Sequence, residues 1–161
     1  MKTTALIMAG EHPDAVIAIF VSNYFPPTGK DAFYETVPRN SPAFFAAWQQ
    51  RAIMLSNEVR VGGAQMYWVS PPPIQSPLAN HAQQIFQDDQ TIAGDHTIDA
   101  GSVLAGSKGQ EVPSKVTCGT TAVVRTADQV HLTGEGARIY GQEIAHLFTS
   151  QTGFLTSPKP C

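Results

Sequence analysis

The sequence is poor in the features that hold a protein to a membrane or to a nucleic acid. Its apolar runs stay below the roughly 20 residues that a membrane-spanning helix needs. The 10 basic and 13 acidic residues give a formal net charge of -3 and are scattered along the chain. The short apolar runs therefore predict no membrane span. Because the basic residues form no cluster, we expect neither a nucleic acid nor an anionic membrane surface as a partner.

Cysteine is scarce as well, since the chain contains only Cys118 and Cys161. Their spacing matches no zinc-binding pattern, so we expect no metal bound through thiolates. A disulfide between them would tie the C-terminal tail to the body of the protein in an oxidising compartment. Two unrelated thiols fit the sequence equally well, and the sequence leaves this choice open.

An export signal is a third missing feature. The opening MKTTALIMAG has one lysine and a short apolar run, but polar residues from Glu11 onward interrupt it before a cleavage site can form. The localisation therefore stays open. Secretion or a place in the cell envelope would require a signal upstream of these residues.

The chain does contain enough apolar material for one core. Of its 161 residues, 42% are hydrophobic, which predicts a single domain over residues 1–161. Two apolar runs, residues 15–22 (AVIAIFVS) and 64–69 (AQMYWV), are typical of strands that are buried on both faces. Weaker strands are predicted over residues 96–99 (HTID) and 121–125 (TAVVR).

Helices are predicted between these strands. Ser41 and Pro42 form a start signal, and Gly62 with Gly63 ends that helix. Thr133 caps a second long helix that runs to about Thr149. Shorter helices are predicted over residues 4–9 and 80–87, and loops over residues 23–40 and 106–119.

Alternating strands and helices indicate an α/β fold with a mostly parallel sheet and helices on both faces. In such sheets, ligands bind beyond the carboxyl ends of the strands. The loop that follows residues 121–125 reads DQVHLT and places Asp128 three residues before His131. A carboxylate that holds the Nδ1 proton of a histidine leaves the other ring nitrogen free to act as a base. The alternative is an ordinary polar turn with a solvated histidine.

The segment DQVHLTGEGARIYGQEIA resembles the D-x-x-H block and the following helix of the SGNH (GDSL-type) hydrolases. The strands in PDAVIAIFVSN and YWVSPPP and the segment TIDAGSVLAG are similar to later strands of that family. The resemblance implies a flavodoxin-like three-layer α/β/α fold and a serine esterase or lipase without cofactor. It implies His131 as the general base and acid, and Asp128 as its orienting carboxylate. The implied substrate is a small acyl ester or an acylated sugar or lipid.

The chain departs from the family at two blocks. The G-x-N-D block falls on Val21-Ser22-Asn23-Tyr24, where only Asn23 matches. The resemblance implies that Asn23 helps to hold the oxyanion, but an asparagine that simply turns the chain before the prolines fits equally well. The G-D-S block with the nucleophile is missing, because no Asp-Ser pair occurs anywhere in the chain. Ser22 and Ser102 follow strands without matching the family pattern.

We therefore expect an SGNH-like domain that is incomplete at its N-terminus, lacks the first strand of the fold and is inactive as it stands. The alternative is a non-catalytic SGNH-like domain that kept the scaffold and binds a ligand or partner. Val21 and Tyr24 in the oxyanion block favour this alternative, whereas the intact pair Asp128 and His131 argues against it.

Overall fold

The computed structural model describes residues 2–20, 41–75 and 79–153. Contacts divide the chain into two compact units. The first unit comprises Met1–Trp68 and Asn80–Thr97, and the second comprises Val69–Ala79 and Ile98–Cys161. Each unit is described by itself below, and the predicted single domain stays a prediction.

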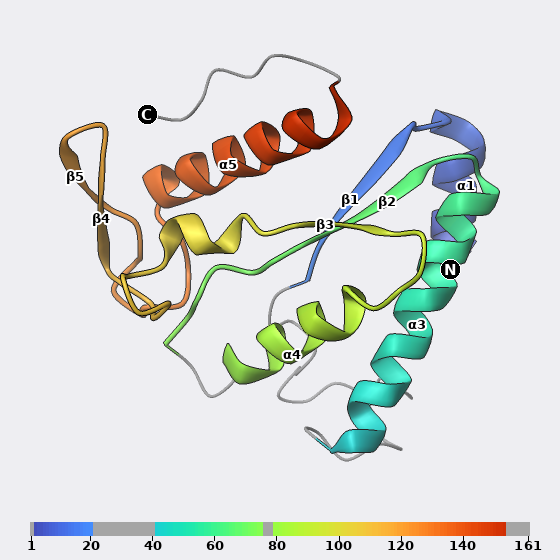
Figure 1. The fold of residues 1–161 in the computed structure, drawn as a ribbon, viewed down its shortest axis with the longest axis horizontal. Helices are drawn as coiled ribbons and strands as arrows, with labels where there is room; N and C mark the ends of the chain where they lie inside the picture. The colour runs from blue at the N-terminus through green and yellow to red at the C-terminus, as the bar shows by residue number, and fades with distance from the viewer. Residues whose placement is uncertain (1, 21–40, 76–78, 154–161) are drawn as a thin grey trace. The chain divides into compact units, whose positions relative to one another are not determined.

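Three strands form a parallel sheet in the order β1-β2-β3, which confirms the α/β class (Figure 1). They are β1 (Ala15–Ile19), β2 (Gln65–Val69) and β3 (His96–Ile98). The prediction of burial on both faces is confirmed for β2, the central strand, in which Met66, Tyr67, Trp68 and Val69 are all buried.

The same prediction is wrong for β1. Val16 and Ala18 pack against the core on one face, whereas Ile17 and Ile19 on the other face are 42% and 41% exposed. The reason is that the core of the first unit covers only one face of β1. An apolar run therefore cannot distinguish a strand that is buried on two faces from one that is buried on a single face.

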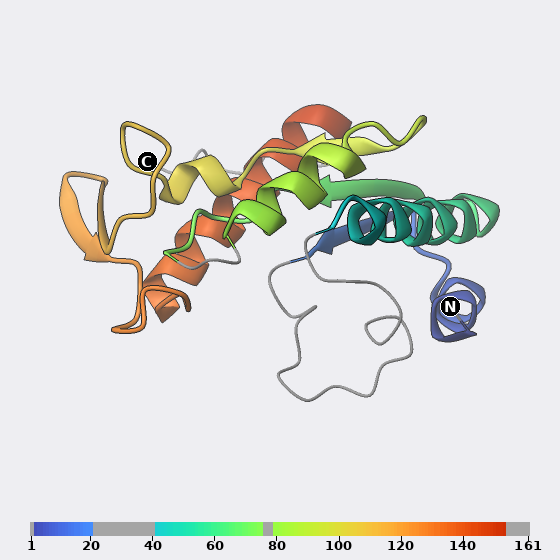
Figure 2. The ribbon, with the colours of Figure 1, turned by 90° about the horizontal axis from the view of Figure 1, so that it is seen from below.

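The helices of the first unit are α1 (Lys2–Glu11), α3 (Pro42–Val61) and α4 (Ala79–Asp89), and α1 packs against α3 (Figure 2). The start of α3 is as predicted, because the Ser41 hydroxyl accepts a hydrogen bond of 3.1 Å from the backbone N–H of Phe44. The end is also as predicted, with Gly62 in the capping position. The core combines side chains of these helices with the sheet: Met8, Ala52, Val59, Ala64, Met66, Trp68, Phe86 and Ile92.

A buried carboxylate links three segments of the first unit. Asp95 accepts hydrogen bonds from Ser56 Oγ at 2.5 Å, from Trp68 Nε1 at 2.8 Å and from Arg60 Nη1 at 3.0 Å. These donors come from α3 and β2, and the Asp95 side chain is 1% exposed. Because each oxygen has a donor, this carboxylate is buried without an unsatisfied acceptor.

The second unit contains a short 3₁₀ helix, η1 (Gly101–Leu104), a hairpin of β4 (Ser114–Thr117) and β5 (Thr120–Val123), and α5 (Gly134–Thr152). Two predictions fail here. Residues 106–119 are not all loop, because they contain β4. The strand predicted over residues 121–125 does not join the parallel sheet, because β5 pairs antiparallel with β4 in a separate sheet.

The hairpin follows from its turn. Cys118 and Gly119 occupy the two turn positions with φ values of 50° and 75°, the left-handed backbone that a two-residue hairpin turn requires. The flanking SKVT and TTAV are rich in β-branched residues, which favour strands. The Cys-Gly pair was the sequence signal for this hairpin. It was missed because the Gly-rich composition of residues 106–119 led to the prediction of a loop there.

Asp89, at the end of α4, is expected to make the stability of the first unit depend on pH. It is 3% exposed, and its Oδ1 has no hydrogen-bond partner among the described residues. Burial, reinforced by the charges of Asp88 and Asp95, raises the pKa of Asp89 from 3.8 to about 8. The stability contribution of Asp89 is therefore fully present below pH 3.8 and is lost as the pH rises through about 8.

At pH 8.5, the free energy of unfolding of the variant Asp89→Asn should therefore be higher than that of the native chain, by about a few kcal/mol. This advantage should disappear at pH 3.5. Urea titrations followed by tryptophan fluorescence test this, because both tryptophans, Trp48 and Trp68, belong to the first unit. Asp14→Asn is the control, since Asp14 is exposed in the same unit and its charge is not among the causes that raise the Asp89 pKa. A difference between Asp89→Asn and the native chain that is the same at both pH values would contradict the expectation.

Candidate active site around Asp128 and His131

The D-x-x-H loop lies between β5 and α5, and its two ends are fixed by hydrogen bonds to the strand side. Thr133 caps α5 as predicted, because its hydroxyl accepts from the backbone N–H of Gly136 at 3.0 Å. The same hydroxyl donates to the Val123 carbonyl at 2.7 Å, and the Thr133 N–H donates to the Val124 carbonyl at 3.1 Å. The start of the helix is thus held directly against the end of the hairpin.

Within the loop, the backbone closes on itself. Arg125 and Leu132 form an isolated antiparallel bridge, and the Thr126 N–H donates to the His131 carbonyl at 2.9 Å. Gln129 at the tip has a φ of 60°, a left-handed conformation that turns the chain back. His131 is therefore returned to a position beside Asp128.

The structure brings Asp128 and His131 together. His131 Nδ1 lies 2.6 Å from Asp128 Oδ2. The other oxygen, Oδ1, accepts from the Thr126 hydroxyl at 2.6 Å and from the backbone N–H groups of Val130 at 2.9 Å and His131 at 3.0 Å. One carboxylate oxygen thus holds the loop and the other holds the imidazole ring.

These hydrogen bonds set the charge of Asp128. The Thr126 hydroxyl is the largest influence and the His131 side chain the next, and together with the backbone N–H groups they hold the pKa of Asp128 well below its usual range. An ionised carboxylate at Oδ2 requires a proton on His131 Nδ1, so Nε2 is the nitrogen that is available as a base. Among the described residues, Nε2 has no hydrogen-bond partner, and the His131 side chain is 77% exposed.

Arg125 lies beneath the loop, 3% exposed. Its guanidinium donates to the backbone carbonyls of Val130, at 2.7 Å, and Pro73. Burial lowers the pKa of Arg125, and the nearby charges of Glu111 and Asp128 act in the opposite direction. The sequence analysis missed this residue, which ends an apolar stretch and gives no signal of its partners.

A second polar cluster, also missed, follows β2 and β3. The buried Ser70 hydroxyl donates to Asp99 Oδ1 at 2.7 Å and accepts from the Gly101 N–H at 2.8 Å. Tyr140 from α5 donates to the Ser70 carbonyl at 2.7 Å. The Ser102 hydroxyl donates to the Asp99 carbonyl at 3.1 Å. Neither serine hydroxyl donates to His131.

The other sequence-predicted residues cannot be placed beside this pair. Asn23, with Val21, Ser22 and Tyr24, lies outside the described residues. Cys118 forms the turn of the hairpin, and its predicted partner Cys161 also lies outside the described residues. The oxyanion role and the disulfide therefore stay predictions.

The described residues contain neither a candidate metal site nor a candidate membrane span. No group of three His, Cys, Asp or Glu residues is arranged to hold a metal ion in the described part of the chain. Within the same part, none of the helices combines the length and the apolar composition needed to cross a membrane.

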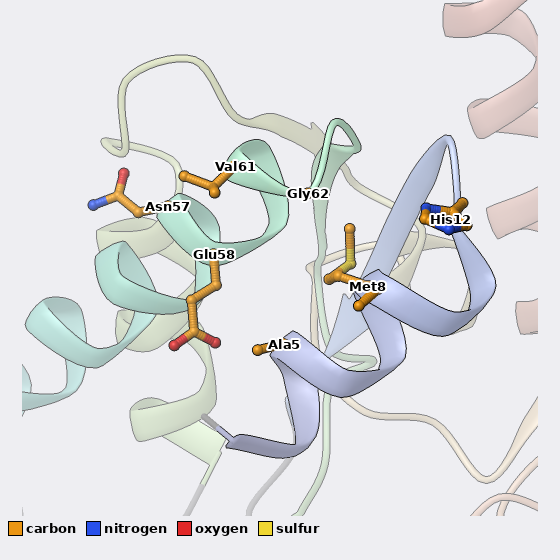
Figure 3. A pocket seen from close by; sticks show the side chains of 8 residues that line it. Ala5, Met8, His12, Asn57, Glu58, Val61 and Gly62 are labelled. Carbon is orange, nitrogen blue, oxygen red and sulfur yellow. The ribbon is translucent and has the colours of Figure 1, made fainter.

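The first unit carries an open pocket of about 420 Å³ between α1 and α3 (Figure 3). None of the predicted site residues lines it. Its lining is mostly apolar, and Glu58 from α3 and His12 after α1 border it: Ala5, Met8, Ala9, His12, Asn57, Glu58, Val61 and Gly62.

Comparison with known proteins gives a family but no function. Residues 1–147 match the family described as "Protein of unknown function (DUF459)", and the chain belongs to this family. No curated protein matches the chain. The match includes the D-x-x-H loop and most of α5.

Gly136 and Gly141 offer a paired test of how α5 is held. A Cβ added at Gly136 would lie 2.2 Å from the Val124 carbonyl oxygen, whereas one added at Gly141 would meet nothing within 4 Å. Gly136→Ala should therefore lower the thermal midpoint of unfolding. Gly141→Ala should raise this midpoint, because alanine is the better helix former and should stabilise the folded state by roughly 0.5–1 kcal/mol. Circular dichroism measures both, and a stabilising Gly136→Ala would show that the helix start is not packed against Val124.

A second test concerns the charge of Asp128. Thr126→Val removes the largest cause of the lowered pKa, so the Asp128 carboxyl group should titrate at a higher pH in this variant than in the native chain. NMR of the carboxyl carbon measures the midpoint directly. Glu135 is the internal control, because the Arg138 side chain lowers its pKa independently of Thr126. An unchanged Asp128 midpoint would mean that the threonine hydroxyl does not contribute.

Proposed function

We propose that this chain is an SGNH-type hydrolase domain that acts on carboxylic esters, with His131 as the base and Asp128 as its orienting carboxylate. The observation that carries the proposal is the 2.6 Å contact between His131 Nδ1 and an Asp128 carboxylate whose pKa is lowered. This arrangement fixes the tautomer that exposes Nε2. The proposed substrate class is a small acyl ester or an acylated sugar or lipid.

Several features of the fold support the family assignment within this proposal. The fold is α/β with a parallel sheet, and the D-x-x-H loop leads directly into the capped helix α5, as the resemblance implies. The edge position of β1 in the described sheet suits a flavodoxin-like sheet whose first strand is not among these residues.

In the proposed reaction, the nucleophilic serine comes from residues that are not contained in this sequence, because no Asp-Ser pair occurs in it. His131 Nε2 removes the serine hydroxyl proton as the serine oxygen attacks the ester carbonyl carbon. Asp128 stabilises the resulting imidazolium, and Asn23 is assigned to donate to the oxyanion. His131 then returns the proton to the departing alcohol, and water hydrolyses the acyl-serine by the same steps.

The second candidate is a non-catalytic SGNH-like domain that binds a ligand or partner. One observation favours it: within the described residues no hydroxyl group donates to His131 Nε2, and the ring is 77% exposed. A histidine that serves as a general base needs its proton donor within hydrogen-bond reach. The two candidates therefore differ in whether His131 is required for any chemistry.

The test compares His131→Ala with His146→Ala in the protein purified at its native length. The intact mass is measured first, since a value well above 17.3 kDa would reveal additional residues that can supply the serine. We expect hydrolysis of a short-chain nitrophenyl ester, blocked by a fluorophosphonate. His131→Ala should reduce it by roughly a thousandfold or more, with His146→Ala near native.

Two outcomes would count against parts of this proposal. A native-length protein without esterase activity, whose ligand binding is unchanged in His131→Ala, would favour the binding domain. Rapid, fluorophosphonate-sensitive hydrolysis by the 161-residue chain alone would contradict the assignment of the serine to other residues.

A further inference from the structure

Arg125 holds the backbone on which His131 is mounted. The peptide group between Val130 and His131 is bound on both sides. Its carbonyl oxygen accepts from Arg125 Nη1 at 2.7 Å, and its N–H donates to Asp128 Oδ1 at 3.0 Å. Because a peptide group is planar, two hydrogen bonds on opposite sides fix its orientation. That orientation sets the direction in which the His131 side chain leaves the backbone.

The other arm of Arg125 reaches the segment that follows β2. Nη2 donates to the carbonyl of Pro73, the last of three consecutive prolines. Prolines have no N–H donor, so the carbonyls of this segment are available as acceptors without a competing ladder of hydrogen bonds. A weaker contact of 3.5 Å, from the Gln75 N–H to the Gln129 carbonyl, joins the same two segments. Arg125 thus fixes the loop against a segment outside the loop.

Stability alone is a poor explanation for an arginine here. The side chain is 3% exposed, and its Nε has no hydrogen-bond partner in the part of the chain that the structure describes. Burying a cation with an unsatisfied donor is unfavourable, and an apolar side chain of similar size often replaces such a group without loss of stability. What an apolar side chain cannot do is donate to two carbonyls from one planar, rigid group.

We propose that Arg125 is a positioning residue, which holds the Val130–His131 peptide so that the imidazole meets Asp128 in one fixed orientation. The purpose of this role rests on the proposed function, but the test of the role does not depend on it. The test observes the ring directly in the 161-residue chain, so a protein that hydrolyses no ester would leave the result interpretable.

The experiment measures the His131 Nδ1–H proton by NMR in ¹⁵N-labelled protein. In the native chain this proton should exchange with water more slowly than that of an unbound imidazole, because Asp128 accepts it in a hydrogen bond. Arg125→Lys keeps the charge but loses the planar pair of donors, and exchange should become roughly tenfold faster. The control is Arg138→Lys, which alters an exposed ion pair with Glu135 on α5 and should leave the exchange rate unchanged. A folded Arg125→Lys variant with native exchange would overturn the proposal.

A second measurement covers the case in which Arg125→Lys does not fold. The native chain is warmed in steps, and the Arg125 Nη–H and His131 Nδ1–H signals are followed together. The proposal expects both to disappear over the same temperature interval, before circular dichroism shows loss of helix. Persistence of the His131 signal after the Arg125 signals have gone would overturn it. In an active native-length enzyme, Arg125→Lys should lower kcat and leave KM nearly unchanged.

Discussion

The carboxylate of Asp128 is the group on which the candidate site depends, because it binds the loop and the imidazole at the same time. Oδ1 accepts three hydrogen bonds from Thr126, Val130 and His131, and Oδ2 meets the His131 ring. All of these donors lie within five residues of sequence, so the pairing needs no distant segment to form it. Arg125 and the capped start of α5 then hold the backbone on both sides of this pair, Arg125 through the Val130 and Pro73 carbonyls and the helix start through Thr133.

This division explains which parts of the molecule could be predicted. Helix caps at Ser41 and Thr133 and the D-x-x-H pair are local, and local chemistry determines them. The parallel sheet was predictable because alternation of strands and helices is a pattern along the chain. The hairpin was missed because a two-residue turn, not hydrophobicity, specifies it. Arg125 and the contact between Ser70 and Asp99 were unpredictable, since their partners are 52 and 29 residues away.

Three aspartates show how much the surroundings decide what a carboxyl group does here. Asp95 is buried, yet each of its oxygens has a donor, so its charge is compensated. Asp89 is buried with an unsatisfied oxygen beside two other acids, and its pKa rises to about 8. Asp128 is half exposed, and its hydrogen bonds hold its pKa well below the usual range. Sequence gives the residue type in all three cases, but it does not show that the pKa values of Asp89 and Asp128 are shifted in opposite directions by their surroundings.

The exposure of His131 connects the two candidate functions. Electrostatic catalysis gains strength when water is excluded from the reacting groups, and a ring that is 77% exposed does not exclude it. The described residues supply neither a hydroxyl partner nor a cover for this ring, and the two are a single requirement, because a segment that brought a serine to Nε2 would also shield the ring. If the native protein contains such a segment, the held imidazole becomes a general base. Without it, the same geometry remains an ordered polar surface suited only to binding.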